Sequence, residues 1–170
     1  MKHIGIAVFG ALLALGTLAP AAHAAQGIYG TWWNPEDTNG DGYGFGFRSQ
    51  IRVNPYVSFD TRASWLKFKD DNFDVFPVEA TAMLKLGMLY AGAGGGYYIF
   101  NNANLQNNFG WYALGGIDVP VGPVGLFGEV RWLELSTDPD KPDPDAGNAG
   151  TRLKANGLNF NIGVMFEPKI

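Results

Sequence analysis

Six consecutive residues near the start of the chain have the composition of a calcium-binding loop. Asp37-Thr38-Asn39-Gly40-Asp41-Gly42 follows the D-x-N-x-D-G pattern, in which side-chain oxygens surround a hard cation. The twelfth position of such a loop normally supplies a bidentate Glu, and here it is Arg48. Asn-Gly and Asp-Gly are also the commonest tight-turn dipeptides, so the segment has a second interpretation as a turn. The pattern makes Asp37, Asn39 and Asp41 candidate metal ligands.

The residues that most often act as general bases or nucleophiles are almost absent. The chain has no Cys, and its two histidines are His3 and His23. Both histidines lie in a segment typical of a secretory signal: Lys2 near the start, an apolar stretch over 4–18, and the small-x-small site Ala22-His23-Ala24. We therefore expect residues 1–24 to be a signal peptide and residues 25–170 to form one domain. Without His or Cys, that domain lacks the usual acid–base and nucleophilic groups, so we expect no enzyme and no cofactor.

The composition excludes further classes of protein. The chain has 170 residues, with 12 Lys plus Arg against 16 Asp plus Glu. This acid excess argues against a nucleic-acid binder, which needs a basic surface. No apolar run after the first 25 residues approaches the ~20 residues of a spanning helix, which excludes a helical membrane protein. Charged residues are only 16% of the chain, and 24 residues are Gly, about twice the usual share of ~7%.

Most of the chain alternates large apolar residues with small or polar ones. This period of two is that of a two-faced β-strand. In the second such segment, Phe59 and Trp65 share a face, and Asp60 and Arg62 share the other. An eighth strand is expected near residues 27–33, with a face that the pattern does not assign. The seven alternating segments are residues 43–53, 57–66, 76–86, 89–99, 111–119, 124–132 and 157–166.

The connections between these segments alternate between long polar loops and tight turns. The long loops are expected over 34–42, 69–74, 101–108 and 136–150, and the turns at Asn54-Pro55, Gly87 and Gly122-Pro123. Each segment is long enough for the ~9–11 tilted residues that cross a bilayer as a strand. An even number of antiparallel strands can close without an exposed edge. The sequence therefore predicts an all-β fold: an eight-stranded antiparallel up-and-down transmembrane β-barrel.

The composition of the polar face indicates whether the outer surface of such a barrel contacts water or lipid. A soluble lipocalin-like barrel lines its cavity with apolar residues and exposes a charged face. Here the polar face is sparse, and five positive and four negative residues fit a narrow interior of paired charges better than a water surface. The apolar face instead suits lipid, because aromatic residues lie near the strand ends: Tyr43, Phe45, Trp65, Phe76, Tyr97, Trp111, Trp132 and Phe166.

Charges that point into a low-dielectric interior must find partners. A simple register around the Asn54-Pro55 turn brings Asp60 near Arg48, and the following loop brings Arg62 near Glu79. Gly94 and Gly96 are expected opposite Glu79, leaving room for its side chain. We therefore predict one interior network of Arg48, Asp60, Arg62 and Glu79, and a second of Asp118, Glu129 and Arg131.

In strand number, loop asymmetry and leader segment, the chain resembles the small eight-stranded outer-membrane barrels of the OmpA/OmpX type. The segment Asn161-Ile162-Gly163-Val164-Met165-Phe166 is similar to the last-strand signal of that family. The chain departs from the family by continuing as Glu167-Pro168-Lys169-Ile170, where an aromatic residue is usual. The resemblance implies long extracellular loops, short periplasmic turns and a location in the bacterial outer membrane of a Gram-negative cell envelope.

The resemblance also implies a function and a set of partners. We expect a structural or surface-interaction role, with outer-membrane lipid and lipopolysaccharide around the barrel, assembly by the barrel assembly machinery, and a surface ligand able to reach the loops. Ten of the 16 acidic residues lie in the long loops, where they could share divalent cations with lipopolysaccharide phosphates. The alternative is a narrow channel for small solutes or ions, porin-like or OmpW-like. An eight-stranded barrel is just wide enough for its side chains to fill, which argues against a wide pore.

Overall fold

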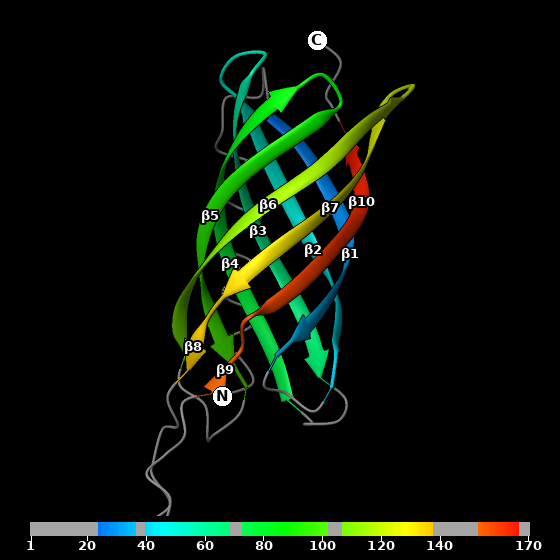
Figure 1. Cartoon of the computed structure of the whole chain (residues 1–170). Helices are drawn as coiled ribbons and strands as arrows, with labels where there is room; N and C mark the ends of the chain where they lie inside the picture. The colour runs from blue at the N-terminus through cyan, green and yellow to red at the C-terminus, as the bar shows by residue number, and fades with distance from the viewer. Residues whose placement is uncertain (1–23, 37–39, 69–72, 102–106, 138–152, 167–170) are drawn as a thin grey trace, which may run out of the picture.

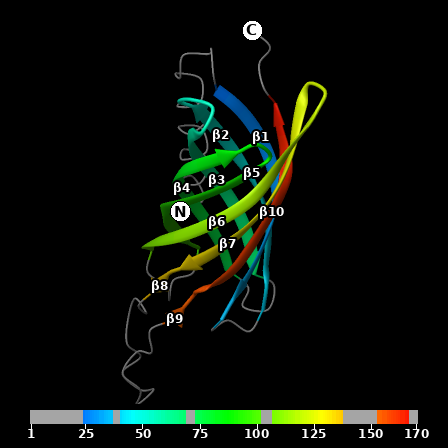
Figure 2. The same cartoon turned by 45° about the horizontal axis from the view of Figure 1, so that its top comes forward.

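The computed structural model describes residues 24–36, 40–68, 73–101, 107–137 and 153–166. Eight long strands wind around one axis as a closed antiparallel barrel, strongly tilted with respect to that axis (Figure 1, Figure 2). Their order around the wall is β1-β10-β7-β6-β5-β4-β3-β2, and the predicted fold class is confirmed. The long strands are β1 (Ala24–Pro35), β2 (Gly42–Arg52), β3 (Val57–Phe68), β4 (Phe73–Leu86), β5 (Leu89–Phe100), β6 (Asn108–Val121), β7 (Val124–Glu134) and β10 (Gly157–Phe166).

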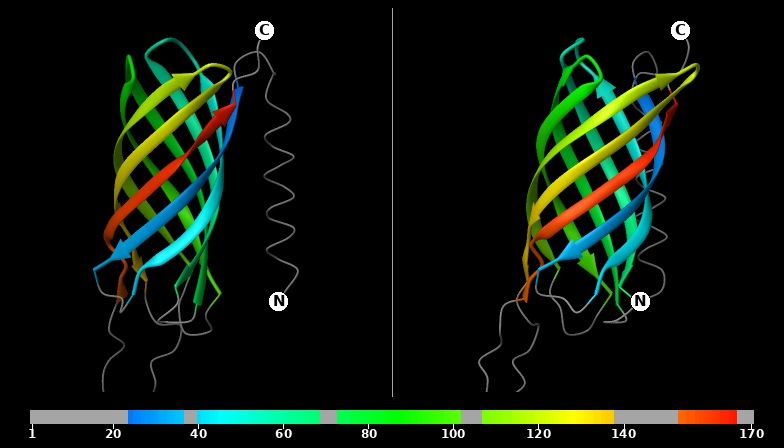
Figure 3. Two further views of the ribbon diagram at one scale, coloured as in Figure 1. Left: turned by 90° about the vertical axis from the view of Figure 1, so that its right-hand side faces the viewer. Right: turned by 45° about the vertical axis from the view of Figure 1, so that its right-hand side comes forward.

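The seam between the first and last long strands closes the barrel. β1 pairs with β10 from Gln26↔Phe166 to Pro35↔Gly157, and the two lie side by side in Figure 3. A separate two-stranded sheet joins β8 (Ser136–Thr137) to β9 (Leu153–Lys154), beyond the end of β7. Among the described residues there is no helix with the length and apolar character needed to cross a membrane.

The two faces of each strand are assigned as the alternation predicts. On β3, Asp60 and Arg62 are each 1% exposed, whereas Phe59 is 51% exposed. On β4, Glu79 and Thr81 are buried, whereas Ala80 and Ala82 are exposed. The face of β1, which the sequence left open, is now defined, because Tyr29, Thr31 and Trp33 point inward and Ile28 outward. The polar face of the strands is the inside of the barrel.

Three tight turns define one end of the barrel, which we call the turn end. Gly87 and Gly122 have φ of 65° and 62°, values that residues with a Cβ rarely adopt. At the third turn, Asn54 Oδ1 accepts hydrogen bonds from the backbone N–H groups of Tyr56 and Val57, both at 2.8 Å. Each turn lies where the sequence predicts it.

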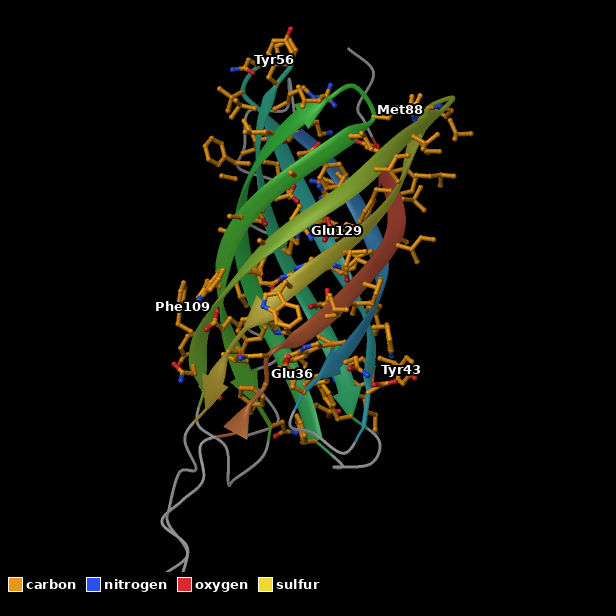
Figure 4. All side chains as sticks on the ribbon, viewed as in Figure 1. Glu36, Tyr43, Tyr56, Met88, Phe109 and Glu129 are labelled. Atoms are coloured by element: carbon orange, nitrogen blue, oxygen red, sulfur yellow. The ribbon has the colours of Figure 1, made fainter. Side chains whose placement is uncertain are left out.

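Backbone hydrogen bonds tie these turns to neighbouring strands. Lys85 N donates to Tyr56 O at 2.8 Å, and Asp118 N donates to Met88 O at 2.7 Å. Figure 4 labels Tyr56 and Met88 at this end. These two turns are therefore continuous with the barrel wall, because each extends the hydrogen-bonded ladder to the next strand.

At the opposite end, which we call the loop end, the strands run further than the alternation indicated. β1 extends to Pro35 and β4 begins at Phe73, inside segments that we expected to be loops. The additional residues alternate in the same way, and Phe73 and Val75 point inward. Most of the outward aromatic residues, Tyr43 and Trp65 among them, lie towards this end, where β2 begins and β3 ends.

Candidate functional site

The centre of the barrel holds a chain of ion pairs drawn from three strands. Asp60 Oδ2 on β3 lies 2.6 Å from Arg48 Nε on β2, as an ion pair, and accepts a hydrogen bond from Arg62 Nη2 at 2.7 Å. Arg62 also donates to both carboxylate oxygens of Glu129 on β7, with Nη2–Oε2 at 3.0 Å. Arg48 Nη1 lies 3.9 Å from Glu129 Oε2. These four side chains are almost fully buried, so each charge depends on the others for stabilisation.

Glu129 is the acceptor at which most of these contacts meet. Beyond Arg62, it accepts hydrogen bonds from the Tyr90 hydroxyl at 3.0 Å and from Asn161 Nδ2 at 2.9 Å. Figure 4 labels Glu129 midway along the barrel. The donors lie on β3, β5 and β10, so this one carboxylate connects walls on different sides of the interior.

Glu79 belongs to a second cluster, with partners that the sequence did not predict. Arg62 and Glu79 are register partners on β3 and β4, as expected. Their side chains nevertheless pair elsewhere, because Glu79 Oε1 accepts from Arg131 Nη2 on β7 and from the Tyr98 hydroxyl, the latter at 2.6 Å. The Arg131 guanidinium lies 3.8 Å from the centroid of the Tyr112 ring.

The glycine gap beside Glu79 is present. Gly96 is the register partner of Glu79, and a Cβ on Gly96 would lie 2.6 Å from Glu79 Cγ. Gly94 is instead opposite Thr81, and a Cβ there would crowd the Tyr112 ring at 2.7 Å. Both glycines make room for inward side chains, but only Gly96 does so for Glu79.

Asp118 lies apart from the residues with which we grouped it. Its Oδ2 accepts from Lys85 Nζ at 2.9 Å, and the same ammonium donates to Gln50 Oε1 at 3.1 Å. This pair lies at the turn end, beside an open vestibule of about 820 Å³ that Arg52 and Pro120 also line. The predicted network of Asp118, Glu129 and Arg131 is therefore replaced by three separate pairings, one for each residue.

The inward ion pairs are balanced in charge. They join four cations, Arg48, Arg62, Lys85 and Arg131, to four carboxylates, Asp60, Glu79, Asp118 and Glu129. An unpaired buried charge would cost several kcal/mol, whereas a paired set with further hydrogen bonds is tolerated. Each of these buried charges thus has an opposite charge beside it on another side chain of the interior.

An apolar plug fills the barrel on the loop-end side of the charges, and the sequence analysis missed it. Phe68 and Phe73 stack with centroids 4.7 Å apart, and Trp33 meets Phe68 edge-on at 5.4 Å. At the loop end of each strand, every second residue still points inward, and these inward residues are apolar. Extending the predicted alternation to the loop end would therefore have identified the plug residues. The plug consists of Trp33, Leu66, Phe68, Phe73, Val75, Phe100, Leu133 and Leu135.

Three of the six residues of the candidate calcium loop, 37–39, fall outside the described residues. Asp37 and Asn39 lie outside them, and only Asp41 can be placed. Asp41 Oδ1 accepts from Asn34 Nδ2 at 2.7 Å, and its Oδ2 accepts from the Tyr43 hydroxyl at 3.3 Å. Among the residues that the structure describes, no three potential metal ligands cluster.

Comparison with solved structures identifies the same fold in outer-membrane proteins. The crystal structure of OprG from Pseudomonas aeruginosa is 14% identical, with a TM-score of 0.62 over 86% of this chain and 96% of that one. Neisserial surface protein A is 15% identical, with a TM-score of 0.62 and the same coverage. The solid-state NMR structure of AlkL in lipid bilayers is 13% identical, with a TM-score of 0.58 over 87% of this chain and 91% of that one. The resemblance to small outer-membrane barrels is therefore confirmed at the level of fold.

Comparison of the sequence gives no closer assignment. No protein-family model matches the chain, and no curated protein matches it.

Proposed function

We propose that this chain is an integral protein of the bacterial outer membrane with a structural or surface-interaction role, and that it does not form an open pore. One observation carries the proposal: side chains close the barrel's cross-section at two levels, while apolar residues cover its outside. The Arg62–Glu129 pair spans the middle, and the plug around Trp33 and Phe68 fills the loop-end side.

The outer surface supports the membrane location. Its most exposed apolar side chains include Leu86, at 75%, and Ile162, at 74%, values that would be unfavourable over a whole surface in water. The long strands have 10 to 14 residues, enough for the ~9–11 that cross a bilayer at a tilt. Solved structures of the same fold, such as OprG, are outer-membrane proteins, which favours the same location here.

The partners follow from this location. Lipid surrounds the wall, lipopolysaccharide faces the loop end, and the barrel assembly machinery inserts the chain; a surface ligand would bind through the loops. We propose no nucleic-acid partner, because 16 acidic residues outnumber 12 basic ones, and no cofactor or enzymatic activity, because residues 25–170 contain neither His nor Cys. The buried carboxylates are each held by Arg or Lys, an arrangement suited to stability rather than to proton transfer.

Two measurements on refolded protein test the proposal. A closed barrel keeps its sheet in detergent, so unboiled protein should migrate differently from boiled protein on an SDS gel. The same sample in a planar bilayer should give no stable unitary conductance. Identical migration together with solubility free of detergent would refute the membrane location, and reproducible unitary steps would instead establish the channel alternative.

A further inference from the structure

The outer wall of the barrel is not evenly convex. A shallow apolar recess of about 860 Å³ crosses it, reaching from Tyr43 on β2 to Leu89 on β5. These strands are the ends of a run of six neighbours, β2-β1-β10-β7-β6-β5, so the recess is about 24 Å long at ~4.8 Å per strand. Its outward side chains are apolar except for Tyr43, whose hydroxyl donates to Asp41 at the loop end.

Outward-facing glycines form the floor of this recess. A Cβ built on Gly30 or Gly128 would meet no atom within 4 Å, and one on Gly115 would find its nearest neighbour at 4.0 Å. Gly95, on the outer face of β5, is different, because a Cβ there would collide with the Phe109 ring. The described chain thus covers Gly95 with an aromatic side chain of its own, but leaves the three outward-facing recess glycines, Gly30, Gly115 and Gly128, uncovered.

The recess is bounded by large apolar side chains in register with these glycines. Gly30 and Gly128 both pair with Ile162 of β10, which rises between them and is 74% exposed. Towards the loop end, Trp32 and Phe160 stack at 5.1 Å and form one wall. The result is a long groove with a low ridge at Ile162, rather than a compact pocket.

We propose that this recess binds one acyl chain of a glycerophospholipid. The proposal rests on the membrane location proposed above, because the recess is continuous with the lipid-facing surface. Its length and apolar lining suit a flexible hydrocarbon chain. A second barrel fits poorly, since a stiff strand of a neighbouring wall cannot follow a groove that curves across six strands.

The bound chain would also insulate the interior. At Gly128 the wall carries no side chain outside, and the next residue is Glu129, the acceptor at the centre of the ion-pair cluster. A hydrocarbon chain over Gly128 keeps water and headgroups away from that backbone. The lipid chain therefore covers the wall at Gly128, where only the backbone separates the interior from the membrane.

The test uses the refolded full-length barrel in detergent and native mass spectrometry, with palmitoyl-oleoyl phosphatidylethanolamine as the probe. Gly30→Leu and Gly128→Leu each add a side chain to the floor of the recess, at positions where the Cβ meets no atom within 4 Å. Ala80→Leu adds an outward side chain on β4, away from the recess, and is the matched control. An SDS gel of unboiled and boiled samples reports whether each variant has folded.

We expect a one-lipid complex with the wild type and with Ala80→Leu, and about tenfold weaker binding with each glycine variant. Equal binding by all four proteins, or no one-lipid complex with the wild type, would overturn the proposal. A protein dimer that Gly128→Leu abolishes would overturn it in favour of a second copy. A wild type that does not insert into vesicles at all contradicts the membrane location itself, which separates that failure from a barrel that inserts but binds no lipid.

Discussion

Arg62 on β3 and Glu129 on β7 stand four strands apart in an eight-stranded ring, on directly opposite walls, yet their side chains are hydrogen-bonded. The guanidinium and the carboxylate together extend across the whole lumen. Asp60 and Arg48 continue this contact along the near wall. The pair acts as a cross-brace, since it joins two strands that share no backbone hydrogen bond.

Replacing Glu129 tests how much this brace contributes to stability. Glu129→Gln keeps the volume and one acceptor but leaves Arg62 without its charged partner on the far wall. Breaking one side of a buried ion pair typically costs ~3–5 kcal/mol, and we expect that loss in a urea unfolding titration in detergent. Glu134→Gln, an exposed position on the same strand, should change the free energy of unfolding by less than ~1 kcal/mol. Equal stability of the two variants would show that water replaces the brace.

A double-mutant cycle distinguishes the observed partner of Glu79 from the one that the sequence suggested. Glu79→Gln combined with Arg131→Gln should show a coupling energy of at least ~1 kcal/mol, because the two side chains are in direct contact. The cycle of Glu79→Gln with Arg62→Gln should show clearly weaker coupling. Denaturant titrations of the wild type, the three single variants and the two double variants measure both values, and stronger coupling to Arg62 would restore the pairing expected from register.

A charge on the outer wall tests the assignment of the two faces. Ala80 is exposed near the middle of β4, so Ala80→Arg places a guanidinium against hydrocarbon. Such substitutions cost ~2–4 kcal/mol at the bilayer midplane. Unfolding from phospholipid vesicles should show this loss, whereas Ala80→Leu should show little. A harmless Ala80→Arg, together with a harmless Phe59→Arg, would mean that inside and outside are reversed.

Because both the Arg62–Glu129 pair and the apolar plug close the lumen, removing part of the plug should lower stability without opening a channel. Trp33 is 2% exposed, and Trp33→Ala should destabilise the protein by ~3–5 kcal/mol as a core truncation. Conductance should nevertheless stay absent in a planar bilayer, because Arg62 and Glu129 still cross the lumen. Unitary steps in folded Trp33→Ala would show that the plug alone closes the barrel.

The fold was predictable because seven of the eight long strands alternate between residues suited to lipid and residues suited to the interior; only the face of β1 was left open. Asp60 and Arg62 on β3 alternate with Phe59 and Thr61, and a slip of one residue would put the charges in lipid. The turns at Gly87 and Gly122 were equally clear, since their backbone needs a residue without Cβ. Alternation and turn chemistry are local properties, which is why a single sequence contains them.

The pairing of the interior charges was only partly predictable. Asp60 and Arg48 lie on adjacent strands and were placed together by the turn alone. Glu79 turned to Arg131 on β7 instead of Arg62, because long side chains reach across the lumen and their partners depend on barrel width and strand stagger. Barrel width and strand stagger are properties of the closed ring, and they cannot be inferred from the alternation along one strand.

The seam at Gln26↔Phe166 has a consequence for the order in which the barrel folds. It pairs the first described strand with the last, so this contact has nearly the greatest sequence separation that the chain allows. Such contacts form slowly, because the entropy of closing a long loop opposes them. Before β10 has paired with them, β1 and β7 each expose a row of unpaired amide and carbonyl groups. Such exposed edges can pair with strands of other chains. A barrel in which β10 is not yet paired is therefore an open sheet with two unpaired edges, and pairing of β10 with both β1 and β7 removes those edges.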